Sequence, residues 1–103
     1  MIDTLTEGTA RDALREVLDP ETGLNLIDLG LIYDVRYDPQ TRVVDVLMTL
    51  TTPACPAGAV MQDAVERRLG LEPGVERVDV RVTFEPRWRP ERISPDGRAQ
   101  LGW

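Results

Sequence analysis

The sequence contains no histidine, no lysine and only one cysteine, Cys55. Without histidine the chain lacks both the usual general base of enzymes and the usual nitrogen ligand of zinc. A mononuclear zinc site within one chain would have to combine Cys55 with carboxylates alone, which is a poor fit. A single cysteine also excludes an internal disulfide and is typical of a reducing compartment, so we expect a cytoplasmic protein.

Long apolar runs and a positive net charge are missing as well. No stretch of about 18 apolar residues occurs, and no charged-then-apolar leader, so we expect neither a membrane span nor a signal peptide. The net charge of −6 argues against nucleic acid or an anionic membrane as a partner. The 103 residues, 42% of them hydrophobic, are enough for one domain with a modest core, which a homodimer would help to stabilise.

The chain is organised around residues 47–56, where an apolar run meets two prolines that flank Cys55. Proline suits the first turn of a helix, and a preceding threonine can bind the free amides there. We therefore predict a helix over residues 56–69 with Cys55 at its N-terminus. The amides and the positive dipole end favour an anion, which predicts a partly accessible thiol with a lowered pKa. The alternative interpretation is that Cys55 is a small buried hydrophobe.

A first helix is predicted near the start of the chain, after a lead-in over residues 1–5. Apolar residues recur at helical spacing over residues 9–18, where Thr6 or Thr9 can cap the helix and Pro20 limits its end. The predicted apolar stripe is Ala10, Ala13, Leu14, Val17 and Leu18.

A β-hairpin is predicted next, with strands over residues 31–37 and 42–51 and a turn at residues 38–41. The first strand would place four apolar or aromatic side chains on one face, namely Leu31, Tyr33, Val35 and Tyr37. The second strand would bury Val44, Val46, Met48 and Leu50. Its other face is not cleanly polar, so we expect another chain to cover part of it.

The second helix is expected to pack through an apolar stripe and to end in a Schellman motif at Gly70 and Leu71. That stripe is Ala57, Val60, Met61, Ala64, Val65 and Leu69. Clean alternation then predicts a third strand over residues 75–85. Residues 86–103 form an irregular arm with a short helical turn over residues 96–101. The arm carries both tryptophans, so it should pack on the body or on a neighbour.

The predicted fold is α/β, with the element order α-β-β-α-β in a single domain over residues 1–103. Two helices of this size can cover a three-stranded mixed sheet, giving a two-layer sandwich with a C-terminal arm. One residue conflicts with this pattern, because Asp28 interrupts the apolar run over residues 26–33. A buried acid needs partners, so Asp28 is predicted to bind nearby amides in a turn.

Three segments carry a family resemblance: Asp19-Pro20-Glu21, the Asp-Leu-Gly-Leu-Ile-Tyr run at residues 28–33, and the Leu-Thr-Thr-Pro-Ala-Cys-Pro run at residues 50–56. In this order and spacing they closely resemble the SufT/PaaD-like family of iron–sulfur assembly proteins. Residues 88–94 and 97–98 are similar to the C-terminal segment of that family. The resemblance covers residues 10–103, and the combination is specific although each motif alone is weak.

The resemblance implies a compact domain, often dimeric, that helps to mature or insert metal–sulfur clusters. It assigns the motif residues to Asp19, Glu21, Thr51, Thr52 and Cys55, with Asp28 in the central motif. The phenylacetate-pathway branch of the family carries a cysteine-rich C-terminal extension that this sequence lacks, which favours the general assembly branch.

Several hypotheses describe the chemistry. One thiolate suits iron or sulfur species but cannot hold a four-iron cluster, which usually takes four cysteines. As an adaptor with no tightly bound cofactor, Cys55 would make one transient bond to a cluster, while scaffold or client proteins supply the rest. Alternatively, a homodimer carries a small cluster on two copies of Cys55, with Asp19 and Glu21 as oxygen ligands. A thiol-nucleophile enzyme and a purely structural module are the remaining alternatives.

Overall fold

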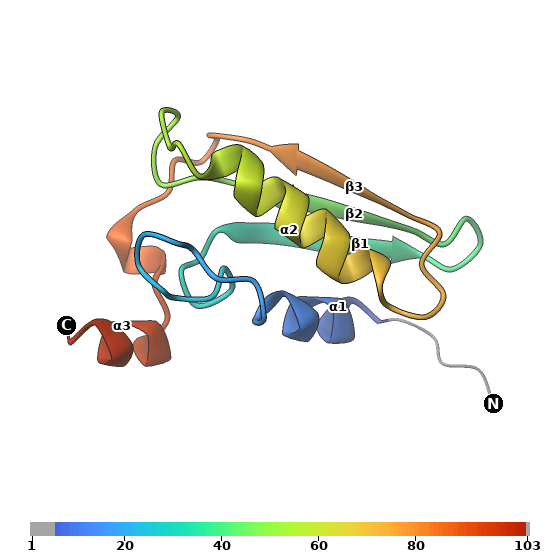
Figure 1. The fold of residues 1–103 in the computed structure, drawn as a ribbon, viewed down its shortest axis with the longest axis horizontal. Coiled ribbons are helices and arrows are strands. Elements are labelled where there is room, and N and C mark those ends of the chain that lie inside the picture. The colour runs from blue at the N-terminus through green and yellow to red at the C-terminus, as the bar shows by residue number, and fades with distance from the viewer. Residues whose placement is uncertain (1–5, 103) are drawn as a thin grey trace.

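The computed structural model of the chain describes residues 6–102 (Figure 1), so the expected lead-in at residues 1–5 and Trp103 lie outside the described residues. Two helices and three strands follow in the predicted order, and a short C-terminal helix comes last. The elements are α1 (Glu7–Leu14), β1 (Ile32–Asp38), β2 (Val43–Met48), α2 (Gly58–Gly70), β3 (Arg77–Val82), the 3₁₀ turn η1 (Pro90–Arg92) and α3 (Pro95–Leu101).

The three strands form one mixed sheet in the order β1-β2-β3, which confirms the predicted fold class. β1 and β2 are antiparallel, and β2 and β3 are parallel because α2 carries the chain back to the start of the sheet. Helix α1 packs on β1, α2 packs on β3, and the two helices contact each other on one side of the sheet (Figure 1). The core lies between these layers and includes the predicted β2 residues Val44, Val46, Met48 and Leu50.

Helix α2 begins at Gly58, two residues later than predicted. Its buried stripe, Gly58, Met61, Val65 and Leu69, is narrower than the predicted one. Val60 is 64% exposed because it lies about 100° around the helix from Met61. The Schellman prediction was also wrong: Gly70 is the last helical residue, and Leu71 has right-handed helical backbone angles and is exposed.

Helix α1 is capped by Thr6, whose hydroxyl accepts from the Thr9 amide at 3.0 Å, but it ends at Leu14 rather than at residue 18. The backbone beyond it pairs with the following loop instead. The Leu26 amide donates to the Val17 carbonyl at 3.0 Å, and Leu18 forms a β-bridge that leaves its side chain exposed. A tertiary pairing therefore replaces the last turn that the periodicity predicted.

Strand β1 contains an irregularity between Ile32 and Asp34 that corrects the predicted face of this strand. Ile32 and Val35 are buried in the core, whereas Tyr33 is only half-buried and its hydroxyl donates to the Pro86 carbonyl at 2.7 Å. A bulge inserts one extra residue into the strand, so the side chains before it lie on the opposite face of the sheet from the one that simple alternation predicts.

The C-terminal arm packs on the body of its own chain and is more regular than predicted, since it contains η1 and α3. The Trp88 indole donates to the Leu29 carbonyl at 2.7 Å, and Ile93 is buried in the core. Gly30 has a φ of +76°, and a Cβ there would lie 2.5 Å from the Arg92 carbonyl oxygen. Only glycine permits both this backbone angle and this close approach of the arm.

Candidate functional site

The three segments that carry the sequence motifs gather at one end of the sheet. β1 begins at this end, and β2 and β3 finish there, so the loops around residues 15–31, 49–57 and 83–94 lie side by side (Figure 1). The opposite end carries the hairpin turn between β1 and β2. The topology thus brings residues that are far apart in sequence to a common edge.

Cys55 and Glu21 contact each other at this end. The half-buried Cys55 thiol donates to Glu21 Oε1, with sulfur and oxygen 4.0 Å apart, although 34 residues separate the two in sequence. Glu21 is exposed, so the pair is open to a ligand or partner. The structure therefore joins the loop after α1 to the loop before α2.

Cys55 is not part of the helix N-terminus, which corrects the predicted placement. Helix α2 begins three residues later, and Ala57 at its N-cap makes no side-chain capping bond. Cys55 instead belongs to two successive turns: its amide donates to the Thr52 carbonyl at 3.1 Å, and its carbonyl accepts from the Gly58 amide at 3.2 Å. The polar group beside the thiol is therefore the Glu21 carboxylate rather than a set of helix amides.

Asp19 shapes the loop that presents Glu21. Its side chain is only 3% exposed, and its carboxylate accepts from the Glu21 amide at 3.0 Å and from the Thr22 hydroxyl at 3.2 Å. Its carbonyl also accepts from the Gly23 amide at 2.8 Å. These bonds form an Asx-type turn, in which an aspartate holds its own following backbone. The two motif acids therefore have different environments.

Of the two motif threonines, Thr52 shapes the turn around Cys55, and neither binds the thiol among the described contacts. The Thr52 hydroxyl accepts from the Ala54 amide at 3.0 Å and thereby closes the turn. Thr51 is half-buried and lines a cavity of about 230 Å³. The other lining residues are Leu50, Thr52, Pro53, Phe84, Arg87 and Trp88. The expectation that these hydroxyls support a thiolate is not met by this geometry.

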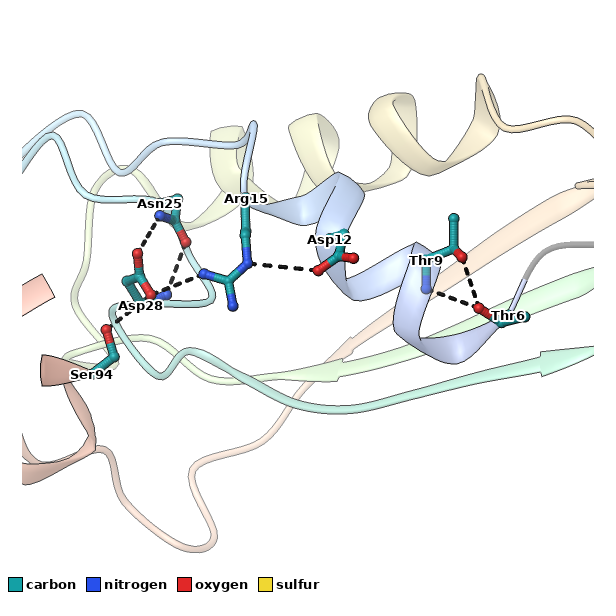
Figure 2. Close-up of polar contacts among 7 residues, drawn as sticks. All are labelled: Thr6, Thr9, Asp12, Arg15, Asn25, Asp28 and Ser94. Carbon is teal, nitrogen blue, oxygen red and sulfur yellow. Dashed lines mark hydrogen bonds and ion pairs between the residues drawn. The ribbon is translucent and has the colours of Figure 1, made fainter. Parts of the chain in front are cut away.

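Asp28 is the centre of a separate polar cluster, shown in Figure 2. Its Oδ1 accepts from Arg15 Nη1 at 3.0 Å and from the Ser94 hydroxyl at 2.9 Å, and its Oδ2 accepts from the Asn25 side-chain amide at 2.7 Å. The Asn25 bond, aided by Ser94 and Arg15, lowers the pKa of Asp28 although burial opposes the shift. Of the amides predicted to bind the Asp28 carboxylate, only the Asn25 side-chain amide does so among the described residues. Through Ser94 the cluster also connects the segment after α1 to the C-terminal arm.

Sequence reasoning missed all three partners of Asp28, which are Arg15, Asn25 and Ser94. Asn25 carries a local signal, because its side-chain oxygen accepts from the Asp28 amide at the three-residue spacing of a turn cap. Ser94 carries none, since 66 residues separate it from Asp28. It also caps α3, as its hydroxyl accepts from the Gly97 amide.

Within residues 6–102, no group of three or more histidine, cysteine, aspartate or glutamate side chains is placed to hold a metal ion. Cys55 and Glu21 together supply two donor groups, and the buried Asp19 and Asp28 use their oxygens in bonds within the fold. No helix in the same part of the chain is long and apolar enough to cross a membrane.

Comparisons with known proteins show the family to which the chain is similar. A family model described as iron–sulfur cluster assembly protein matches residues 7–82. The Fe–S protein maturation auxiliary factor SufT of Staphylococcus aureus is 35% identical over 86 residues, covering 84% of this chain and 97% of that protein. An iron–sulfur cluster carrier protein of Synechocystis is 37% identical over 98 residues, which cover 95% of this chain but 26% of the relative.

A solved structure shows the same fold. A conserved hypothetical protein from Thermotoga maritima is 41% identical, with a TM-score of 0.83 and complete coverage of both chains. The similarity therefore extends through the arm as well as the sheet, and the resemblance inferred from the motifs is confirmed.

Proposed function

We propose that this chain, a member of the iron–sulfur cluster assembly protein family, is an accessory factor in the maturation of client proteins. In this role the Cys55 thiolate makes one transient bond to the cluster of the client. The observation that carries the proposal is the contact between Cys55 and Glu21 at 4.0 Å on the end where the motif loops meet. A half-buried thiol beside an exposed carboxylate is accessible to a large partner.

The donor count favours an adaptor over a resident cluster. A four-iron cluster usually takes four cysteine thiolates, and this chain has one. The remaining bonds to the cargo then come from a scaffold or from the client. On this hypothesis the cluster is cargo, and the chain itself has no catalytic role.

Glu21 has a specific task in this scheme. A cysteine binds iron as the thiolate, so its proton must leave when the sulfur–iron bond forms. The Glu21 carboxylate already accepts the thiol hydrogen bond and is placed to take that proton from Sγ. Asp19 acts indirectly, because it holds the Glu21 amide in the turn that brings the carboxylate to the thiol.

The second candidate is carriage of a small cluster between two copies of the chain. A relative named as a cluster carrier supports it, although this chain matches only about a quarter of that protein. Two copies would offer two Cys55 thiolates and two Glu21 carboxylates. Anaerobic reconstitution with iron and sulfide separates the candidates: stable visible absorbance in stoichiometric amount supports carriage, and its absence supports the adaptor.

The proposal is tested by complementation of a strain that depends on this protein. We expect Cys55→Ser to abolish maturation of an aconitase-type enzyme, because serine stays protonated near neutral pH and is a weak ligand for iron. Ala54→Ser, a change at the exposed neighbouring position, is the matched control and should complement fully. A non-iron enzyme reports general defects. Full complementation by Cys55→Ser would refute a role for the thiol.

A further inference from the structure

The arginines of the body and those of the C-terminal arm differ in whether they pair with acids. The ion pairs among the described residues all use arginines of the body, which are Arg15, Arg36, Arg42, Arg67, Arg68 and Arg77. The exposed arm residues Arg87, Arg89 and Arg92 form no ion pair with any described residue. The arm therefore presents unpaired positive charge on a chain whose net charge is −6.

One of these arginines lines a cavity of about 230 Å³ between the motif loop and the arm, which we call the loop–arm cavity. Its apolar walls come from both segments and are Leu50, Pro53, Phe84 and Trp88. The Trp88 indole N–H already donates to the Leu29 carbonyl at 2.7 Å, so the ring is held in place and has no donor left. The walls of the cavity are therefore aromatic, apolar and fixed by the fold.

The polar groups of the loop–arm cavity are donors in search of an acceptor. The Arg87 guanidinium and the Thr51 hydroxyl line the cavity, and neither forms a hydrogen bond with a described residue. The Thr52 hydroxyl accepts from the Ala54 amide at 3.0 Å and keeps its own hydrogen to donate. Among the described lining residues there is no acid, whereas three larger cavities of the surface each include at least two.

We propose that the loop–arm cavity binds one carboxylate side chain from an acidic segment of the client protein. The carboxylate would accept hydrogen bonds from Arg87 and from the hydroxyls of Thr51 and Thr52, and its methylene stem would pack on the aromatic walls. Hydrogen bonds between a guanidinium and a carboxylate are among the stronger polar contacts in proteins. The assignment of the segment to a client rests on the proposed function, whereas the preference for a carboxylate rests on the cavity alone.

The size of the cavity favours a side chain over a free small molecule. Small-molecule sites usually measure about 300–1,000 Å³, and the loop–arm cavity has about 230 Å³. A single glutamate side chain fits such a space, and the rest of the segment stays outside. Further acids of the segment would be attracted by the unpaired arginines of the arm, which also orient the approach of an acidic partner toward this end of a negatively charged chain.

The loop–arm cavity and the thiol share one turn of the backbone. Thr52 lines the cavity, and its carbonyl accepts from the Cys55 amide at 3.1 Å. The motif loop and the arm also lie side by side at the end of the sheet where Cys55 is found (Figure 1). A segment held in the cavity therefore brings the surface of the client next to the turn that carries the thiol.

The experiment titrates iron-free protein with a capped glycine–serine peptide that has a central leucine–glutamate–leucine, up to about 5 mM, and follows it by nuclear magnetic resonance. We expect shifts of the Trp88 indole and of residues 50–53. The same peptide with glutamine in place of glutamate should bind about tenfold or more weakly, and so should Arg87→Gln with the glutamate peptide. Thr51→Val should bind several-fold more weakly.

Arg89→Gln is the matched control, because it removes the same charge from an exposed arm position that does not line the cavity. We expect its affinity to fall by no more than about twofold. Equal losses in Arg87→Gln and Arg89→Gln would overturn the proposal, since they would indicate a diffuse effect of charge. Equal binding of the two peptides would overturn it as well. Inorganic phosphate that bound more tightly than the glutamate peptide would indicate a phosphate site instead.

Complementation then tests whether the occupant is a client. Arg87→Gln should lower maturation of an aconitase-type enzyme, and Arg89→Gln should retain most of it; circular dichroism establishes that both are folded. Normal maturation by an Arg87→Gln variant that no longer binds the peptide would refute the client as occupant. The titration contains no iron, so its result is independent of the role of Cys55. Failure of the thiol proposal and failure of the loop–arm cavity are therefore distinguishable.

Discussion

Two acids at the same end of the molecule have opposite circumstances. Asp28 is 6% exposed and accepts from three side chains, two from the segment after α1 and one from the arm (Figure 2). Glu21 is exposed and makes one long contact to a thiol. A buried charge is stable only when its bonds are satisfied, and removing it leaves its partners unmatched. An exposed acid with one weak contact adds little to folding and is free for a ligand. The comparison predicts that Asp28 stabilises the fold around the site and that Glu21 acts at the thiol.

The largest effect on stability should come from Asp28→Ala. The change leaves Asn25 and Ser94 without their buried acceptor, while Arg15 is half-exposed and regains water. We expect the free energy of unfolding to fall by about 2–4 kcal/mol. Urea denaturation measures it. A loss below about 0.5 kcal/mol would mean that the cluster does not hold the arm to the body.

Asp19→Ala should cost about 1–2 kcal/mol, because the buried turn loses its acceptor for the Glu21 amide and the Thr22 hydroxyl. It should also weaken maturation by displacing Glu21 from the thiol. Asp19→Asn keeps one acceptor oxygen and should recover part of both losses. Equal activity for wild type and Asp19→Ala would show that the turn does not need this side chain to place Glu21.

The dependence of stability on pH should test the contribution of the Asp28 cluster. The pKa of Asp28 is lowered in the folded chain, so its ionised form contributes stability above the unfolded value of about 3.9, and this contribution is lost as the pH falls through the folded pKa. The stability difference between the wild type and Asp28→Asn should therefore shrink below about pH 4. Urea unfolding at pH 7 and pH 3 gives that difference. A constant difference would mean that the carboxylate charge is not what stabilises the cluster.

Glu21→Gln should have the smallest effect on folding, within about 0.5 kcal/mol, because the side chain is exposed. Its effect should appear in function instead. If the carboxylate accepts the thiol proton when the sulfur–iron bond forms, maturation should slow in Glu21→Gln, because the amide cannot accept that proton. Glu91→Gln, at an exposed acid of the arm, is the matched control. A large stability loss with unchanged maturation would reverse the roles assigned to Glu21 and Asp28.

The sequence alone predicted the element order, the mixed sheet and the buried face of β2, because hydrophobic periodicity is a local property of the chain. It predicted the ends of elements poorly. Helix α1 ends early because Leu26 binds the Val17 carbonyl, and α2 starts late because residues 52–58 form turns. In both places a hydrogen bond outside the helix replaced one that the local pattern favoured.

The motifs by themselves predicted a shared role for Asp19, Glu21 and Cys55, but only the tertiary structure separated their environments. Asp19 and Glu21 are two residues apart, and nothing in the sequence indicates which of them is buried. The loop after α1 packs so that one carboxylate binds its own backbone and the other reaches a thiol 34 residues away. Asp28 finds Ser94 across 66 residues for the same reason: chain spacing determines local periodicity, and packing determines which distant polar groups meet.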